Sequence, residues 1–151
     1  MSVMHEGRRP LVVGWGNCLR RDDGIGPRVA AEVARRLGDA VELRTPIQLL
    51  PELALDIARA SRVVLVDAAV DQPPGTVRCR AIAATRRFDH QLHDLRPETI
   101  LAHAGTLTGC PTPTWLVTVG AADIGLGEGL SPEVEDALGS AAATVCRLLC
   151  T

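Results

Sequence analysis

The residues best suited to chemistry begin in a glycine-rich turn that carries two adjacent acids. In chain order the turn contains Gly14, Gly16, Asn17, Asp22, Asp23 and Gly24. Carboxylates act as general acids or bases and coordinate divalent metal ions. Either acid could instead cap the following helix, because an Asp at an N-cap accepts a hydrogen bond from a free backbone N–H. Capping explains one of the two acids but not the pair.

The same turn matches a dinucleotide-binding loop only in part. After Gly14 and Gly16, the third glycine of G-x-G-x-x-G would fall at position 19, which is Leu19. A pyrophosphate also needs positive potential at a helix N-terminus, whereas Asp22 and Asp23 place negative charge there. A nucleotide-binding α/β enzyme therefore stays as an alternative. A thiol nucleophile at position 18 of the turn is a weaker one, because the nearest charges are a mixture of Arg and Asp.

A third acid and two histidines are expected to join this turn. Asp67 directly follows the apolar run Val63–Val66, and the carboxyl ends of parallel strands face the ligand crevice of an open sheet. His90 and His93 lie in the irregular segment 84–96, and long loops are often functional. Two carboxylates and one imidazole suit a borderline divalent ion and leave positions open for water or substrate. The plain alternatives are a solvated acid and surface histidines.

The elements that position these residues alternate between strands and helices. Apolar runs and alternation predict strands over 11–15, 41–44, 62–67, 76–82 and 114–119; helical spacing predicts helices over 26–37, 50–60, 97–107 and 131–149. The pattern predicts one α/β domain over residues 1–151 with three layers. A mostly parallel five-stranded sheet carries helices on both faces. Disorder is expected only over about residues 1–9.

Composition excludes several classes of function. All 16 basic residues are Arg and the formal net charge is -2, so nothing favours nucleic acid or an anionic membrane as a partner. Only Trp15, Phe88 and Trp115 are aromatic, which leaves no base-stacking surface. No apolar run is long enough for a membrane span and no signal peptide is recognised, so we expect a cytoplasmic protein. Five scattered cysteines without a CxxC pair argue against a disulfide frame or a structural zinc site.

Four segments, in this order, resemble the hydrogenase maturation proteases. They are Gly14–Gly26, with Asn after the second glycine and then the acidic pair, Val64–Ala68, the His-x-Leu-x-Pro segment 93–97, and Gly129–Val134. The match extends roughly from Leu11 to Leu149. The resemblance implies an endopeptidase that removes the C-terminal extension from the precursor of a [NiFe] hydrogenase large subunit after nickel insertion.

The resemblance also implies which residues meet the metal. It assigns Asp23, Asp67 and His93 to nickel, with His90 as a competitor of His93, and it makes Asp23 and Asp67 the catalytic pair. The nickel is expected to arrive with the substrate, so no cofactor is stably bound. A turn that binds substrate or shapes the site is implied for Gly14, Gly16, Asn17, Asp22 and Gly24. Asp23 stands where many members have the longer Glu, which alters its reach.

The residues leave the mechanism and two rival functions open. Water could be activated by the metal or by a carboxylate, or Asp23 and Asp67 could share one proton as an aspartic dyad. A module that senses or escorts nickel without cutting anything would use the same residues, and a nucleotide-binding enzyme is the other rival. The metal hypotheses require Asp23, Asp67 and His93 to meet at one end of the sheet, within reach of a single ion.

Overall fold

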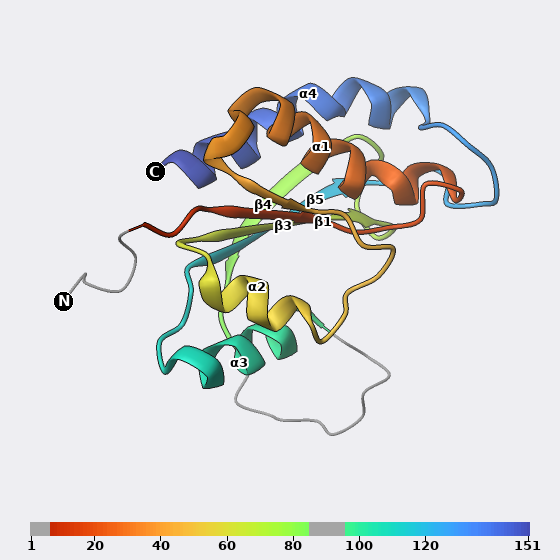
Figure 1. The fold of residues 1–151 in the computed structure, drawn as a ribbon. Helices are drawn as coiled ribbons and strands as arrows, with labels where there is room; N and C mark the ends of the chain where they lie inside the picture. Colours follow the sequence, from red (N-terminus) through yellow and green to blue (C-terminus); the bar gives the residue numbers. More distant parts are fainter. Residues whose placement is uncertain (1–6, 85–95) are drawn as a thin grey trace.

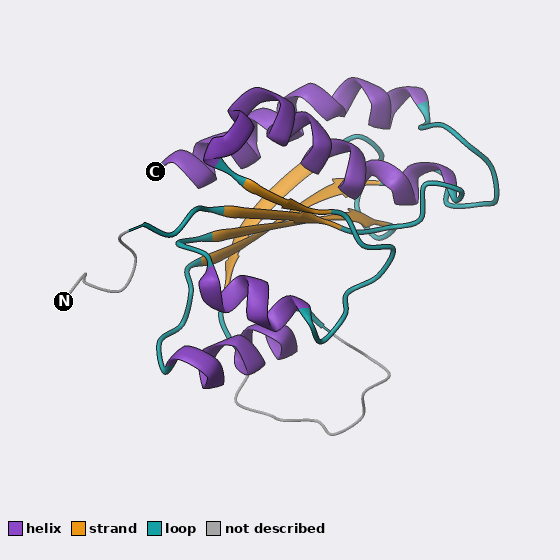
Figure 2. Ribbon diagram, viewed as in Figure 1, coloured by secondary structure: helices purple, strands orange, loops and turns teal. Residues whose placement is uncertain are grey.

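The computed structural model describes residues 7–84 and 96–151. In chain order the elements are β1 (Leu11–Gly14), the 3₁₀ turn η1 (Arg21–Gly24), α1 (Ile25–Leu37), the 3₁₀ turn η2 (Gly38–Ala40), β2 (Glu42–Arg44), α2 (Leu53–Arg59), β3 (Val63–Ala69), β4 (Val77–Ile82), α3 (Pro97–Thr108), β5 (Thr114–Gly120) and α4 (Pro132–Cys150). Helices α1 and α4 cover one face of the sheet and α2 and α3 the other (Figures 1 and 2). The predicted three-layer α/β fold is confirmed.

The order of strands in the sheet is β2-β1-β3-β5-β4. Strand β4 runs antiparallel to β5, and the other neighbours are parallel. The chain leaves β1 toward β2 and then returns past β1 to β3, so the direction of winding reverses between β1 and β3. In open α/β sheets, ligands bind outside the carboxyl ends of the strands at this switch point. The fold therefore marks the ends of β1 and β3 as the place to look for a site.

Two apolar clusters hold the layers together. Val64 on β3 belongs to the cluster beneath α1 and α4, whereas its neighbour Leu65 belongs to the cluster beneath α2 and α3. Both side chains are almost fully buried, as expected for a central strand covered on both faces. Burying one such side chain contributes about 1.5–3 kcal/mol. This alternation fixes the register of β3 and therefore the face on which each following residue lies.

Two predicted boundaries differ from the observed ones by more than one residue. Helix α2 begins at Leu53, because a turn precedes it in which the N–H of Leu53 bonds the carbonyl of Leu50 at 3.1 Å. Strand β3 continues to Ala69, since its parallel pairing with β5 extends that far. Asp67 therefore lies two residues before the end of the strand, opposite Thr118, rather than at its last position.

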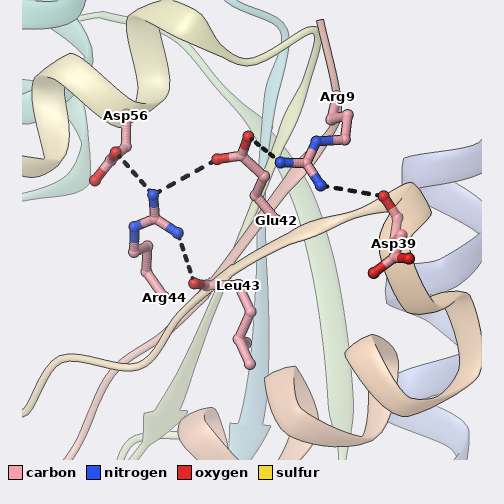
Figure 3. A network of polar contacts seen from close by, with 6 residues as sticks. All are labelled: Arg9, Asp39, Glu42, Leu43, Arg44 and Asp56. Carbon is pink, nitrogen blue, oxygen red and sulfur yellow. Dashed lines mark hydrogen bonds and ion pairs between the residues drawn. The ribbon is translucent and has the colours of Figure 1, made fainter.

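Strand β2 is a short edge strand tied down by partly exposed charges (Figure 3). Arg9 bonds Glu42 at 2.9 Å and the carbonyl of Asp39 at 3.2 Å, and Arg44 bonds Asp56 at 3.2 Å. Exposed pairs of this kind contribute about 0–1 kcal/mol each. Charges at an edge also discourage pairing with a foreign strand.

The two ends of the described chain bear on two sequence predictions. Of residues 1–9, for which the sequence predicts disorder, residues 1–6 lie outside the described residues. Within the described part, Arg8 donates to the carbonyl of Ala58 at 3.1 Å, and the carbonyl of Arg9 accepts from Ser61 at 3.1 Å. No helix in the described ranges is long and apolar enough to cross a membrane.

Candidate active site at the switch point

The glycines of the first turn bring it against β3. A Cβ on Gly14 would overlap the carbonyl oxygen of Gly26, and a Cβ on Gly26 would lie 2.7 Å from the carbonyl oxygen of Val66. Gly16 has a φ of +143°, and a Cβ there would overlap the carbonyl oxygen of Asp23. The space that glycines leave open in a phosphate loop is filled here by the protein's own backbone. The turn thus serves close packing, and nothing in it favours a nucleotide.

Asp22 is buried and ties the turn to the loop between β5 and α4. Its carboxylate accepts hydrogen bonds from the N–H groups of Ala122 (2.8 Å), Asp123 (2.9 Å) and Ser131 (2.7 Å) and from Ser131 Oγ (2.8 Å). Burial alone would raise the pKa of Asp22, but the bonds from Ser131, Asp123 and Ala122 outweigh it and hold the pKa below its ordinary value. Asp22 therefore acts as a structural anion.

Asp23 is fixed within its own turn. Its Oδ2 accepts a hydrogen bond from the N–H of Asn17 at 2.7 Å, and Asn17 Oδ1 accepts from the N–H of Leu19 at 2.9 Å. Neither Asp22 nor Asp23 caps α1, because the N-cap is Gly24 and no side chain bonds there. The capping alternative is therefore wrong for both acids. Asp23 has a bonded oxygen that orients it and a second oxygen, Oδ1, that accepts no bond from the described residues.

Asp67 faces the same site from β3. It lies two residues beyond Leu65, so its side chain is on the α2/α3 face of the sheet. Partial burial raises the pKa of Asp67 to about 7; a bond from the N–H of Ala68 opposes the rise, and the negative charge of Asp23 adds to it. The charge of Asp23 thus acts on Asp67, as expected when the first turn and β3 end at the same edge of the sheet. Asp67 thus keeps its proton up to near neutral pH.

The third predicted metal ligand cannot be placed. His93 and its competitor His90 lie in residues 85–95, outside the described residues. Across residues 7–84 and 96–151, no group of three His, Cys, Asp or Glu side chains is arranged to hold a metal ion. The site as described is a pair of carboxylates, which suits a divalent ion only when other ligands complete its shell. The predicted roles of Asp23, Asp67 and His93 in metal binding stay predictions.

Several large apolar side chains are exposed on the loops near Asp23 and Asp67. The large ones lie at the carboxyl edge of the parallel strands, on loops and turns, and are Leu19, Ile47, Leu50, Val70, Ile124 and Leu126. Backbone bonds join their loops, since Gly127 N–H bonds the carbonyl of Leu19 at 2.9 Å and Gly16 N–H bonds that of Pro46 at 3.3 Å. We call these six side chains the apolar rim. Clustered exposed apolar groups are typical of protein-binding surfaces.

Sequence reasoning missed the partners of Asp22. Ser131 does precede α4 as predicted, with Pro132 at the first helical position, but its hydroxyl bonds Asp22 and makes no cap bond to the helix. The donors lie about a hundred residues from the acid along the chain. Local pattern carries no signal for such a contact. The one sequence feature that pointed to a structural acid was the presence of two adjacent acids in the turn.

Fold and site together define a class: a doubly wound α/β domain with two interacting carboxyls at its switch point. Solved structures with this fold include the hydrogenase maturating endopeptidase HybD from E. coli, at 27% identity and a TM-score of 0.73, covering 93% of this chain and 91% of that one. A hydrogenase 2 maturation peptidase from a Thaumarchaeota archaeon is 27% identical, with a TM-score of 0.68 and coverage of 94% and 98%.

A third similar structure is an endopeptidase from Escherichia coli, at 26% identity and a TM-score of 0.69, covering 91% of this chain and 89% of that one. No protein-family model and no curated protein sequence matches the chain. In its fold and in the order of its motifs, the chain is similar to the [NiFe] hydrogenase maturation proteases.

Proposed function

We propose that this protein is an endopeptidase that removes the C-terminal extension from the precursor of a [NiFe] hydrogenase large subunit once nickel has been inserted, and that it recognises the nickel held by that precursor. The observation that carries the proposal is the interacting pair of Asp23 and Asp67 at the switch point. The endopeptidases of 26–27% identity share the fold that forms this point.

The chemistry assigned to the pair follows from their surroundings. With a pKa near 7, Asp67 can take a proton from an attacking water and return it to the leaving amine. Asp23, oriented by Asn17, presents its Oδ1 toward nickel carried by the substrate, together with a loop imidazole assigned to His93. Carboxylate oxygen and imidazole nitrogen are both acceptable ligands for such an ion. The protein itself needs no stably bound cofactor in this scheme.

A mass measurement tests the proposal. Nickel-loaded precursor mixed with this protein should shorten at its C-terminus, and nickel-free precursor should keep its mass. Asp67→Asn and Asp23→Asn should still bind the loaded precursor without shortening it. If the wild-type protein binds precursor with confirmed nickel and leaves its mass unchanged, the non-catalytic nickel-sensing module is the better account.

The apolar rim predicts how a folded protein substrate is held. We expect Leu126→Asp, which puts a charge on a side chain 80% exposed, to raise KM for the precursor about tenfold with little change in kcat. Leu107→Asp is the matched control, because Leu107 is 58% exposed on α3, away from the rim. Both variants should keep the wild-type melting temperature. Equal KM values for the two variants would remove the rim from substrate binding.

A further inference from the structure

A polar groove lies on the same face of the sheet as Asp67, and Thr118, which pairs with Asp67, lines it. Its volume is about 510 Å³, and its lining includes Ala69, Thr118, Arg78 and Arg80. None of these lining residues has a part in the cleavage chemistry proposed above. The groove is therefore a second feature of the site that needs an occupant.

Strand register places this groove beside Asp67. Asp67 pairs with Thr118 on β5, and Thr118 pairs with Arg78 on β4. Directly paired residues on neighbouring strands point to the same face, so these three side chains form one row across the sheet. The preceding row runs from Leu65 through Leu116 to Arg80.

The two rows differ in what covers them. Leu65 and Leu116 are buried in the apolar cluster beneath α2 and α3, whereas Asp67 and Thr118 are partly exposed. The row that contains Asp67 therefore begins where the helices stop covering the sheet. A peptide lying along this row would run from Asp67 on β3 to the edge strand β4.

The floor of the groove is rigid. Gln72 is only 5% exposed, and its Nε2 donates to the carbonyls of Thr76 (2.7 Å) and Thr118 (3.3 Å). Thr118 Oγ1 donates in return to Gln72 Oε1 at 2.8 Å. These buried bonds satisfy the amide within the protein, so Gln72 shapes the groove rather than binding a ligand.

Among the described residues of the groove, the positive charge that stays available is Arg78. Arg80 already bonds Glu98 at 3.3 Å, and the exposed Asp71 lines the groove without an ion pair to either arginine. Arg78 is exposed and has no hydrogen bond or ion pair among the described residues. Guanidinium groups favour carboxylates, to which they donate two parallel hydrogen bonds.

We propose that this groove holds the peptide segment being cleaved and that Arg78 pairs with an acidic side chain of that segment, about three residues from the scissile bond. The inference rests on the proposed function. Neighbouring strands lie about 4.8 Å apart, so Asp67 and Arg78 are separated by roughly 10 Å. An extended peptide advances about 3.3 Å per residue, which gives the spacing of three. Arg78 would thereby help determine which precursor is cut.

A charge-swap experiment tests the pairing. With nickel-loaded precursor, Arg78→Glu should lower kcat/KM at least tenfold, mainly through KM, and Arg78→Ala should have a smaller effect in the same direction. Arg59→Glu is the control. It also reverses the charge of an exposed arginine, but Arg59 is the last residue of α2, shortly before the chain enters the amino end of β3. Changing one Asp or Glu within four residues of the cleavage site to Lys should restore cleavage by Arg78→Glu.

Binding supplies a second readout. In an Asp67→Asn background, which should hold the precursor without cutting it, Arg78→Glu should weaken binding about tenfold and Arg59→Glu should not. Wild-type kinetics in Arg78→Glu, or no rescue by any acid-to-Lys change near the cleavage site, would overturn the inference and leave the protease assignment standing. Failure of the wild-type protein to cut loaded precursor would instead count against the proposed function.

Discussion

Asp67→Asn should abolish cleavage and, above neutral pH, make the protein more stable. The amide keeps the shape of the side chain but can neither take nor deliver the proton, so we expect kcat to fall by about 10²–10⁴-fold. The ionised carboxyl, partly buried and beside Asp23, is costly to the folded state. Removing that charge stabilises the folded protein wherever Asp67 would be ionised. Loss of activity with a gain in stability is typical of a strained functional group.

The sign of the pH dependence follows from the raised pKa. The ordinary value is 3.8 and the folded value about 7, so between these pH values the folded state keeps a proton that the unfolded chain has lost. Wild-type stability therefore falls as pH rises through this window and levels off above about pH 7. After a discount for partial exposure, the free energy of unfolding of Asp67→Asn should exceed that of the wild type by about 2–3 kcal/mol at pH 8. At pH 4 the variant and the wild type should be nearly equal.

Urea unfolding without metal, at pH 4, 6 and 8, measures this difference. Asp136→Asn, at an exposed position on α4, is the control and should show no such pH dependence. A second check is Asp23→Asn, which should lower the pKa of Asp67 only in part, because burial is the larger cause. If Asp67→Asn is less stable than the wild type at every pH, the carboxyl is a structural group and loses its catalytic assignment.

The fold can be predicted from the sequence because the patterns that specify its strands and helices are local. Apolar spacing predicts each strand and helix of the described residues, and the continuous run at Val63–Val66 identifies the central strand. Parallel strands present their carboxyl ends at one edge of the sheet, which places Asp67 and the first turn together. The proximity of Asp23 and Asp67 to one edge of the sheet therefore follows from local sequence patterns, whereas the strand order that creates the switch point does not.

What the sequence could not supply depends on register and on contacts between distant segments. The pairing of Asp67 with Thr118 and of Thr118 with Arg78 follows from a one-residue choice of register, which no composition pattern sets for an antiparallel edge strand. The roles of Asp22 and Asp23 also look interchangeable in sequence. They separate only because one carboxylate turns into the protein toward Ser131 and the other toward Asn17.

Asp22→Asn should be among the most destabilising changes in the site. An amide can accept through its oxygen, but its NH₂ group would face N–H donors that the carboxylate now satisfies. Hydrogen bonds to a charged group contribute about 1.5–3 kcal/mol each, and leaving buried donors unpaired removes more than the bonds themselves. We expect a loss of about 3–5 kcal/mol. Ser131→Ala, which removes the hydroxyl donor but keeps the backbone bond, should cost about 1 kcal/mol.

The loss of stability caused by Asp22→Asn should become smaller at acidic pH. The same substitution should also weaken substrate binding, because it loosens the loop that carries part of the apolar rim. Because the folded pKa lies below the ordinary 3.8, the stability that Asp22 contributes is present above that value and is lost as pH falls through the folded value. The same carboxylate fixes the start of the loop that carries Ile124 and Leu126, so KM for the precursor should rise while kcat changes less. In Asp22→Asn, the backbone amides of residues 121–131 should exchange hydrogen faster than they do in Ser131→Ala. An unchanged exchange rate there would mean that Asp22 does not hold this loop, and the tie between the turn and the rim would fail.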